Sequence, residues 1–173
     1  MSNPPAPGPG RLRGVLAVLL VLLPLVVGVA VWYLADGQRD DAEAARDEDR
    51  AAVSAATLEV LNWADVDYQA LDPYFETVKE GATGDFLKEF TETEETLRQG
   101  LVENQSVQVP TIPKNGAALL ERDGDVARVV VAFDAVVTNL ATKGKPQPRQ
   151  YRMQVTLRKV DGDWLTEKLE FVG

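Results

Sequence analysis

Few side chains in this 173-residue chain could carry out catalysis, because it contains neither cysteine nor histidine. The lack of cysteine excludes a thiol nucleophile, and the lack of histidine removes the commonest general base and the commonest metal ligand. A catalytic site would have to use carboxylates, lysine or tyrosine. The sequence also has no phosphate-binding glycine loop, nucleophile elbow or cluster of metal ligands, so we expect neither a metal nor a cofactor.

The carboxylate of Asp134 is the best candidate for a general base, since it interrupts the apolar stretch VVVAFDAVV at 129–137. A carboxyl group buried in such a strand would have a raised pKa and could accept a proton. Side-chain alternation argues against burial, because the opposite face of the strand, which includes Phe133, is the more apolar one. We therefore expect Asp134 on the outer face, paired across strands with a base such as Arg152 or Arg158.

Asp67, Tyr68 and Trp164 are the remaining candidates, and each has a structural alternative. Asp67 and Tyr68 follow a predicted helix, where they either form a turn with a packed tyrosine or line the mouth of a cavity. Trp164 opens the last predicted strand, where it fills the core, caps the end of the sheet or stacks against a ligand. The Asp-Gly-Asp sequences at 123–125 and 161–163 lack the ligand spacing of a calcium loop and are typical of hairpin turns.

Three helices are expected to precede the strands and to support these residues. The first begins near residue 40, and its apolar face consists of Val53, Ala56, Val60 and Ala64. The second has Asp72 as its N-cap and Pro73 at its first helical position, and Gly81 ends it. The third is expected to start near residue 84 and to fade near residue 104.

From residue 106 onward the hydrophobic period changes from helical to two, which is typical of strands. One strand is expected at 106–112, and two hairpins follow with turns at Asp123-Gly124 and Asp161-Gly162. At 151–158 we expect Tyr151, Met153, Val155 and Leu157 in the core and Arg152, Gln154, Thr156 and Arg158 in solvent. This order predicts an α+β fold, with helices on one face of a curved, mainly antiparallel sheet of about four strands.

Residues 14–35 form the longest apolar stretch and predict a transmembrane helix. Its first 21 residues carry no charge and would span roughly 31 Å, close to the thickness of a hydrocarbon core. A cleaved signal peptide is the alternative, but its apolar region is shorter. Because Arg11 and Arg13 precede the stretch, the N-terminus is expected in the cytoplasm. We divide the chain into a disordered cytoplasmic tail (1–13), the transmembrane helix (14–35) and an exported domain (36–173).

The charge distribution excludes nucleic acid as a partner. The net charge is −9, and all 27 acidic residues follow Leu34. Such a domain is repelled by the phosphates of nucleic acids.

Two segments of the predicted domain resemble the Mce-associated membrane proteins of actinobacteria. They are VDYQALDPYFETVKEGATGDF at 66–86 and VDGDWLTEKLEFV at 160–172. The resemblance rests on the Asp67-Tyr68 pair, the GATGDF run and the Gly-Asp-Trp-Leu sequence ending at Leu165, and it covers most of residues 40–173. It implies a single N-terminal span, an NTF2-like (SnoaL-like) cone outside the membrane and a place beside an Mce lipid-import complex. The matching motifs are structural rather than catalytic.

We therefore expect a non-enzymatic, single-pass accessory or scaffold protein of an Mce-type lipid-import complex in the cell envelope. Its partners would be the membrane and proteins of that complex. A cone that binds a lipid or another small molecule is the alternative, followed by a carboxylate-dependent enzyme. An open apolar pocket would favour binding, and a buried carboxylate inside that pocket would favour an enzyme. The residues expected at a pocket or docking surface are Asp67, Tyr68, Arg152, Arg158 and Trp164.

Overall fold

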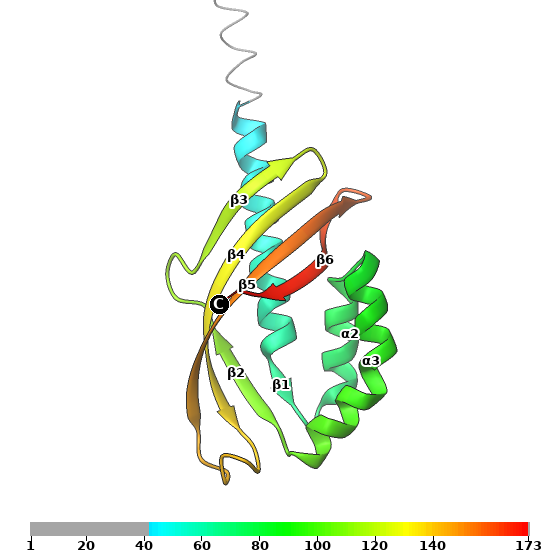
Figure 1. Ribbon diagram of the computed structural model, residues 1–173. Helices are drawn as coiled ribbons and strands as arrows, with labels where there is room; N and C mark the ends of the chain where they lie inside the picture. Colours follow the sequence, from blue (N-terminus) through cyan, green and yellow to red (C-terminus); the bar gives the residue numbers. More distant parts are fainter. Residues whose placement is uncertain (1–41, 173) are drawn as a thin grey trace, which may run out of the picture. The chain divides into compact units, whose positions relative to one another are not determined.

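The computed structural model describes residues 42–172 (Figure 1). The chain divides into two compact units, Met1–Arg46 and Asp47–Gly173. The predicted cytoplasmic tail and transmembrane helix lie outside the described residues. Within residues 42–172, no helix is both long enough and apolar enough to cross a membrane.

The helices lie where the sequence predicts them. Residues 42–64 are helical, and α2 (Leu71–Glu80) and α3 (Gly84–Glu103) follow. The buried face of the first helix consists of Ala52, Ala56, Val60 and Ala64. Val53, predicted on that face, is only half-buried. The N-cap of α2 is Ala70 rather than Asp72, because the helix begins two residues earlier and puts the Asp72 carboxylate in its first turn. An acidic group there complements the helix dipole.

The sheet has more strands than the four that were predicted. Its strands in the described residues are β1 (Val66–Asp67), β2 (Val107–Thr111), β3 (Ala117–Asp123), β4 (Val126–Thr138), β5 (Gln147–Val160) and β6 (Asp163–Phe171). Their order is β1-β2-β4-β5-β6, with β3 also on β4, and every strand pair is antiparallel. The predicted hairpin turn at Asp161-Gly162 is confirmed, and the turn predicted at Asp123-Gly124 lies one residue later, at Gly124-Asp125, because Asp123 is the last residue of β3.

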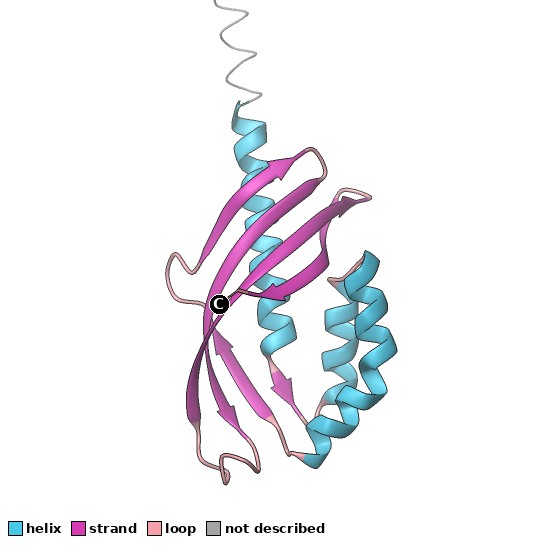
Figure 2. Cartoon of the chain, viewed as in Figure 1, coloured by secondary structure: helices cyan, strands magenta, loops and turns pink. Residues whose placement is uncertain are grey.

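Two features explain the difference in strand number. β4 is 13 residues long, so β2 and β3 share one of its edges, β2 along its second half and β3 along its first. β1 has only two residues and therefore shows no hydrophobic period. The α+β class and the NTF2-like order, helices first and then a curled antiparallel sheet, are confirmed (Figure 2).

Alternation divides the sheet into two faces. The inner face packs on the helix that ends at residue 64, and its buried side chains include Val129, Val131, Phe133, Met153, Val155 and Leu157. The outer face carries Asp134, Arg152 and Arg158, all of which are exposed. The predicted alternation at 151–158 is thus confirmed, although Tyr151, predicted in the core, and Gln154 and Thr156, predicted in solvent, are all half-buried.

The core consists of two hydrophobic clusters. The larger lies between the inner sheet face and helical residues 52–64. The smaller lies between α2, α3 and β1, and it consists of Val66, Leu71, Tyr74, Phe75, Val78 and Phe90. Trp63 packs against both clusters. The α2–α3 hairpin is therefore a second layer, joined to the sheet layer along a seam.

Candidate functional site

Asp134 lies on the outer face, as predicted, but it does not pair with Arg152 or Arg158. Its Oδ1 accepts a hydrogen bond from Gln150 Nε2 at 3.0 Å. The pairing follows from strand register, because Gln150 stands directly opposite Asp134 and Arg152 stands opposite Ala132. Asp134 is thus a solvated carboxylate on a sheet surface.

The two arginines that were predicted to form a docking surface have different surroundings. Arg158 is held by Glu167, with its Nε 2.7 Å from Oε1 and its Nη2 3.0 Å from Oε2. This hydrogen-bonded pair raises the pKa of Arg158. Arg152 is exposed and forms no ion pair within residues 42–172. Only Arg152 therefore keeps a guanidinium that a partner could bind without displacing another group.

Asp67 and Tyr68 form a turn. Asp67 Oδ1 accepts a hydrogen bond from the Gln69 backbone N–H at 2.9 Å, which is the geometry of an Asx turn. The Gln69 side chain donates to the Tyr68 hydroxyl at 3.0 Å. Asp67 is exposed and lines a groove of about 250 Å³ with Asp65 and Asn62. These contacts favour the structural alternative for Asp67 and Tyr68, which is a turn rather than the mouth of a cavity.

Trp164 is buried and fills the core, with its polar edge turned to the helix. Its Nε1 donates to Glu48 Oε2 at 3.2 Å, and the Lys159 ammonium lies 2.6 Å from the same oxygen. Lys159 first, and then Trp164, lower the pKa of Glu48. The ammonium also lies 5.7 Å from the centre of the indole ring. These contacts fasten the helix at Glu48 to the β5–β6 hairpin.

The sequence interpretation missed Glu59, which is the buried acid of this domain. Glu59 is 3% exposed, and its Oε1 has no hydrogen-bond partner in the described structure. Burial raises the pKa of its carboxyl group to about 8, so the group is largely protonated at neutral pH. A signal was present in the sequence, since Glu59 follows Ala52 by seven residues and Ala56 by three. That spacing places it beside the apolar face.

The carboxyl group of Glu59 lies at the seam between the two hydrophobic clusters. It is so close to Gly81 that a Cβ built there would lie 1.8 Å from Glu59 Oε2. Gly81 in turn accepts a hydrogen bond from the Thr166 backbone N–H at 2.8 Å, and the buried Thr166 hydroxyl has no partner in the described structure. Glu59 also raises the pKa of Tyr74, after the larger effect of burial. Gly81, the first glycine of the GATGDF run, thus leaves space for the carboxyl group of Glu59.

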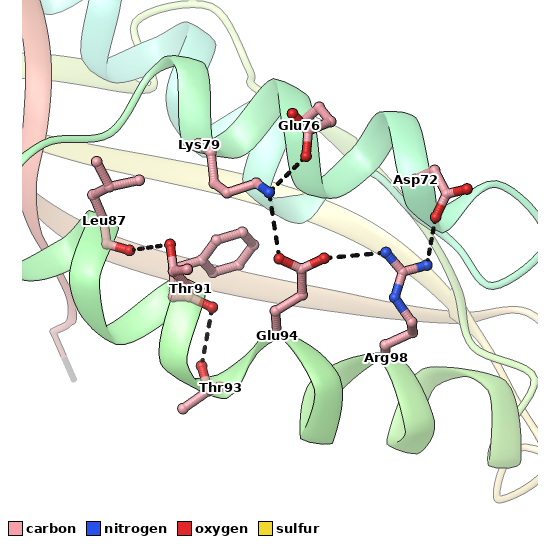
Figure 3. A network of polar contacts seen from close by, with 9 residues as sticks. Asp72, Glu76, Lys79, Leu87, Thr91, Thr93, Glu94 and Arg98 are labelled. Carbon is pink, nitrogen blue, oxygen red and sulfur yellow. Dashed lines mark hydrogen bonds and ion pairs between the residues drawn. The ribbon is translucent and has the colours of Figure 1, made fainter.

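A network of ion pairs holds α2 and α3 together (Figure 3). Lys79 binds Glu76 at 2.6 Å and Glu94 at 3.4 Å, and Arg98 binds Asp72 at 2.7 Å and Glu94 at 3.1 Å. All five residues belong to these two helices. The network therefore stiffens the hairpin itself, while Glu59 lies where the hairpin meets the rest of the domain.

The surface grooves of residues 42–172 include a smaller one of about 350 Å³, lined by Trp164 and Leu58, and three larger ones. Two overlap on the outer sheet face, where both are lined by Asp134 and Gln150, and their volumes are about 460 and 550 Å³. The third, of about 550 Å³, follows the C-terminal half of α3 past Leu97, Gly100 and Leu101. Glu59 lines none of the three. The buried carboxyl group and the accessible grooves are thus in different places.

Comparisons with known proteins concern family and fold. Residues 12–173 match the model of a family described as uncharacterized protein Rv1363c/MT1408-like. The chain is 31% identical over 154 residues to the uncharacterized protein Rv1362c of Mycobacterium tuberculosis (strain ATCC 25618 / H37Rv), which covers 87% of this chain and 68% of that protein. None of these names refers to an Mce-type complex, so that part of the sequence resemblance stays a prediction.

Two solved structures have a similar fold. The periplasmic domain of DotI superposes with a TM-score of 0.59 at 9% identity, over 72% of this chain and 94% of that one. An IcmL-like type IV secretion system protein of Legionella pneumophila subsp. pneumophila str. Philadelphia 1 superposes with a TM-score of 0.56 at 9% identity, over 69% and 88%. At these identities the likeness concerns the fold alone.

Proposed function

The chain belongs to the Rv1363c/MT1408-like family of uncharacterized proteins, and on this premise we propose that it is a membrane-anchored, non-enzymatic accessory protein of an Mce-type lipid-import complex in the cell envelope. The apolar stretch at 14–35 would be its single span, with the N-terminus in the cytoplasm and the domain outside. The resemblance at 66–86 and 160–172 supports the link to Mce-type complexes.

The observation that carries the proposal is the separation of the buried acid from the surface grooves. An enzyme of this shape needs a carboxyl group with a raised pKa that can reach a substrate. Glu59 is buried in a packed seam, and the centre of the fold is filled by side chains such as Phe75, Phe133 and Met153. The accessible polar residues lie on the outer sheet face instead, where Arg152 and Asp134 form no ion pairs within the described part of the chain. This arrangement supports binding to a protein rather than catalysis.

The proposal is tested by purifying the tagged full-length chain from envelopes in mild detergent. We expect Mce-type subunits to copurify, and we expect their steady-state amounts to fall in cells that lack the chain. Normal amounts of those subunits in such cells, together with no copurification, would reject the accessory role.

Membrane topology is tested separately. A reporter enzyme that is active only outside the cytoplasm is fused after Gly173, and we expect it to be active because Arg11 and Arg13 hold the N-terminus inside. A fusion protein made in normal amounts but inactive would reverse the orientation.

Lipid binding is the second candidate, and the groove along α3 favours it. This groove is mainly apolar, and, apart from the adjoining residues of α3 itself, no atom lies within 4 Å of the position that a Cβ on Gly100 would take. A lipid carried there should be detected by native mass spectrometry of the purified chain. The Gly100→Phe variant would fill the groove and should remove the lipid, whereas Glu95→Phe, at an exposed position of α3 outside the groove, should retain it. Equal lipid content in the two variants would reject this site.

A further inference from the structure

The outer sheet face has two halves that differ in how their charges are satisfied. The half we call paired carries Glu121, Arg128, Thr156, Arg158, Glu167, Lys168 and Glu170. There Arg128 binds Glu121, Arg158 binds Glu167 at 2.7 Å, and Lys168 binds Glu170 at 2.7 Å. The half we call open carries Val109, Thr111, Ala132, Asp134, Val136, Pro148, Gln150 and Arg152, and it forms the floor of the two overlapping grooves.

One row of the open half is apolar and faces solvent. Strand register places Val109 opposite Val136, and Val136 opposite Pro148, so the three side chains form a row across β2, β4 and β5. Val109 is 55% exposed and Val136 is 45% exposed. Cross-strand neighbours on one face are about 5 Å apart, so the row forms a continuous patch. Such a patch gains free energy when a second surface covers it.

The neighbouring rows carry an acid and a base that do not bind each other. Asp134 stands opposite Gln150, and Arg152 stands opposite Ala132, so Asp134 and Arg152 are diagonal neighbours at roughly 7–8 Å between backbones. Both are exposed, and within residues 42–172 neither forms an ion pair. Arg149 lies at the rim and adds a second base. The patch therefore offers both signs of charge to a partner.

A partner is expected to cover this face rather than to extend the sheet at its edge. β6 ends at Phe171, opposite Met153, and the Val172 N–H still binds the Arg152 carbonyl at 2.9 Å. Beyond that point the free edge of β5 contains Pro148, which has no N–H to donate. Proline at an edge blocks the addition of another strand.

We infer that the open half is a docking surface for the open half of a second copy of this chain. In a face-to-face pair, a two-fold axis in the interface that exchanges Asp134 and Arg152 bisects the line between them, and so runs close to the other diagonal, which joins Ala132 and Gln150. Each Asp134 then meets the Arg152 of the other copy, which gives two ion pairs from one contact. The same rotation brings the groove beside Val136 toward the groove beside Val172. The inference does not depend on the proposed function.

The test uses thiol-specific cross-linking of the full-length chain, which is clean because the natural chain has no cysteine. Gln150→Cys lies near the axis, and sheets packed face to face lie about 10 Å apart, so a bis-maleimide reagent of about that length should join the two introduced thiols. We expect covalent dimers with this reagent in envelopes and in detergent. Thr156→Cys, in the paired half, is the control and should stay monomeric. Equal cross-linking of the two variants, or none with Gln150→Cys, would overturn the inference.

Charge exchange supplies a second readout that is independent of the anchor. Asp134→Arg alone and Arg152→Asp alone should each weaken dimerisation at least tenfold in sedimentation experiments, because each places like charges together. The double variant should restore it, since the pairs reform with opposite polarity. Arg128→Asp, in the paired half, is the control and should leave dimerisation unchanged. A double variant as weak as the singles, or singles that dimerise like the natural chain, would overturn the inference; unchanged melting temperatures would show that each variant is folded.

Discussion

The two faces of this sheet are formed by the same strands but differ in how far their side chains are buried. On the inner face, Val129, Val131, Val155 and Leu157 are almost completely buried, and the helix that ends at residue 64 covers them. On the outer face, the alternate residues of the same strands are exposed or half-buried. A substitution on the inner face should therefore change stability, because it changes packing. A substitution on the outer face should change association, because little packing is lost.

The largest expected effect comes from a core truncation on the inner face. Leu157→Ala should lower the free energy of unfolding by about 2–5 kcal/mol, since Leu157 is 1% exposed and its removal leaves a cavity. The neighbouring Thr156→Ala, on the outer face, should change it by about 0.5 kcal/mol or less. Urea unfolding of the full-length chain followed by circular dichroism measures both. Similar losses in the two variants would show that the faces do not differ as described.

The next largest effect concerns the seam that joins α2 to the sheet layer. Gly81→Ala should destabilise the domain by about 1–3 kcal/mol, because the new methyl group would overlap Glu59 Oε2. In a chain that already carries Glu59→Ala, the Gly81→Ala change should cost little stability, because the overlapping carboxyl group is gone. In a chain that carries Glu59→Gln, it should cost as much as in the natural chain, because glutamine has the same volume as glutamate. A Gly81→Ala variant as stable as the natural chain would place the carboxyl group elsewhere.

The pH dependence of stability should report the protonation of Glu59. Its folded-state pKa of about 8 is higher than the ordinary value of 4.5, so the folded protein keeps a proton that the unfolded chain loses. The stabilisation is complete below pH 4.5 and is lost as the pH rises toward 8, by up to about 1.4 kcal/mol per pH unit. Glu59→Gln should flatten this slope. An equally steep slope in that variant would assign the effect to other groups.

The smallest expected effects separate the two halves of the outer face. Arg158→Gln removes the two hydrogen bonds to Glu167 and should lower the melting temperature slightly, since exposed ion pairs contribute little. Arg152→Gln should leave the melting temperature unchanged and should weaken dimerisation instead. Calorimetry and sedimentation of the same two samples measure the contrast. A larger thermal loss in Arg152→Gln would contradict the assignment of this residue to an open surface.

Local patterns in the sequence could predict most of the fold. The period of two at 151–158 identified the buried Met153, Val155 and Leu157, and the Asp-Gly pairs located both hairpin turns to within one residue. The strand β1 could not be predicted, because two residues show no hydrophobic period, and the sharing of one edge of β4 by β2 and β3 is set by tertiary packing. Local periodicity does not report which strands become neighbours.

The candidate site was harder to predict, because its contacts depend on register. Asp134 meets Gln150 only because the loop between β4 and β5 sets which residues stand opposite each other. Arg158 reaches Glu167 where the pairing of β5 with β6 shifts between Thr156 and Leu157. Glu59 was missed for another reason: the buried face of the helix was defined from its apolar residues alone, although the spacing of Glu59 from Ala52 and Ala56 placed it beside that face.

The central claim is that the interior of this domain is structural and that its outer surface is functional. Glu59→Gln tests the claim most directly, because it removes the buried acid while keeping its size. In cells that produce only this variant, with its melting temperature confirmed at or above that of the natural chain, we expect normal amounts of Mce-type subunits. A folded Glu59→Gln protein that fails to maintain those subunits would contradict the account and would identify the buried carboxyl group as the functional site.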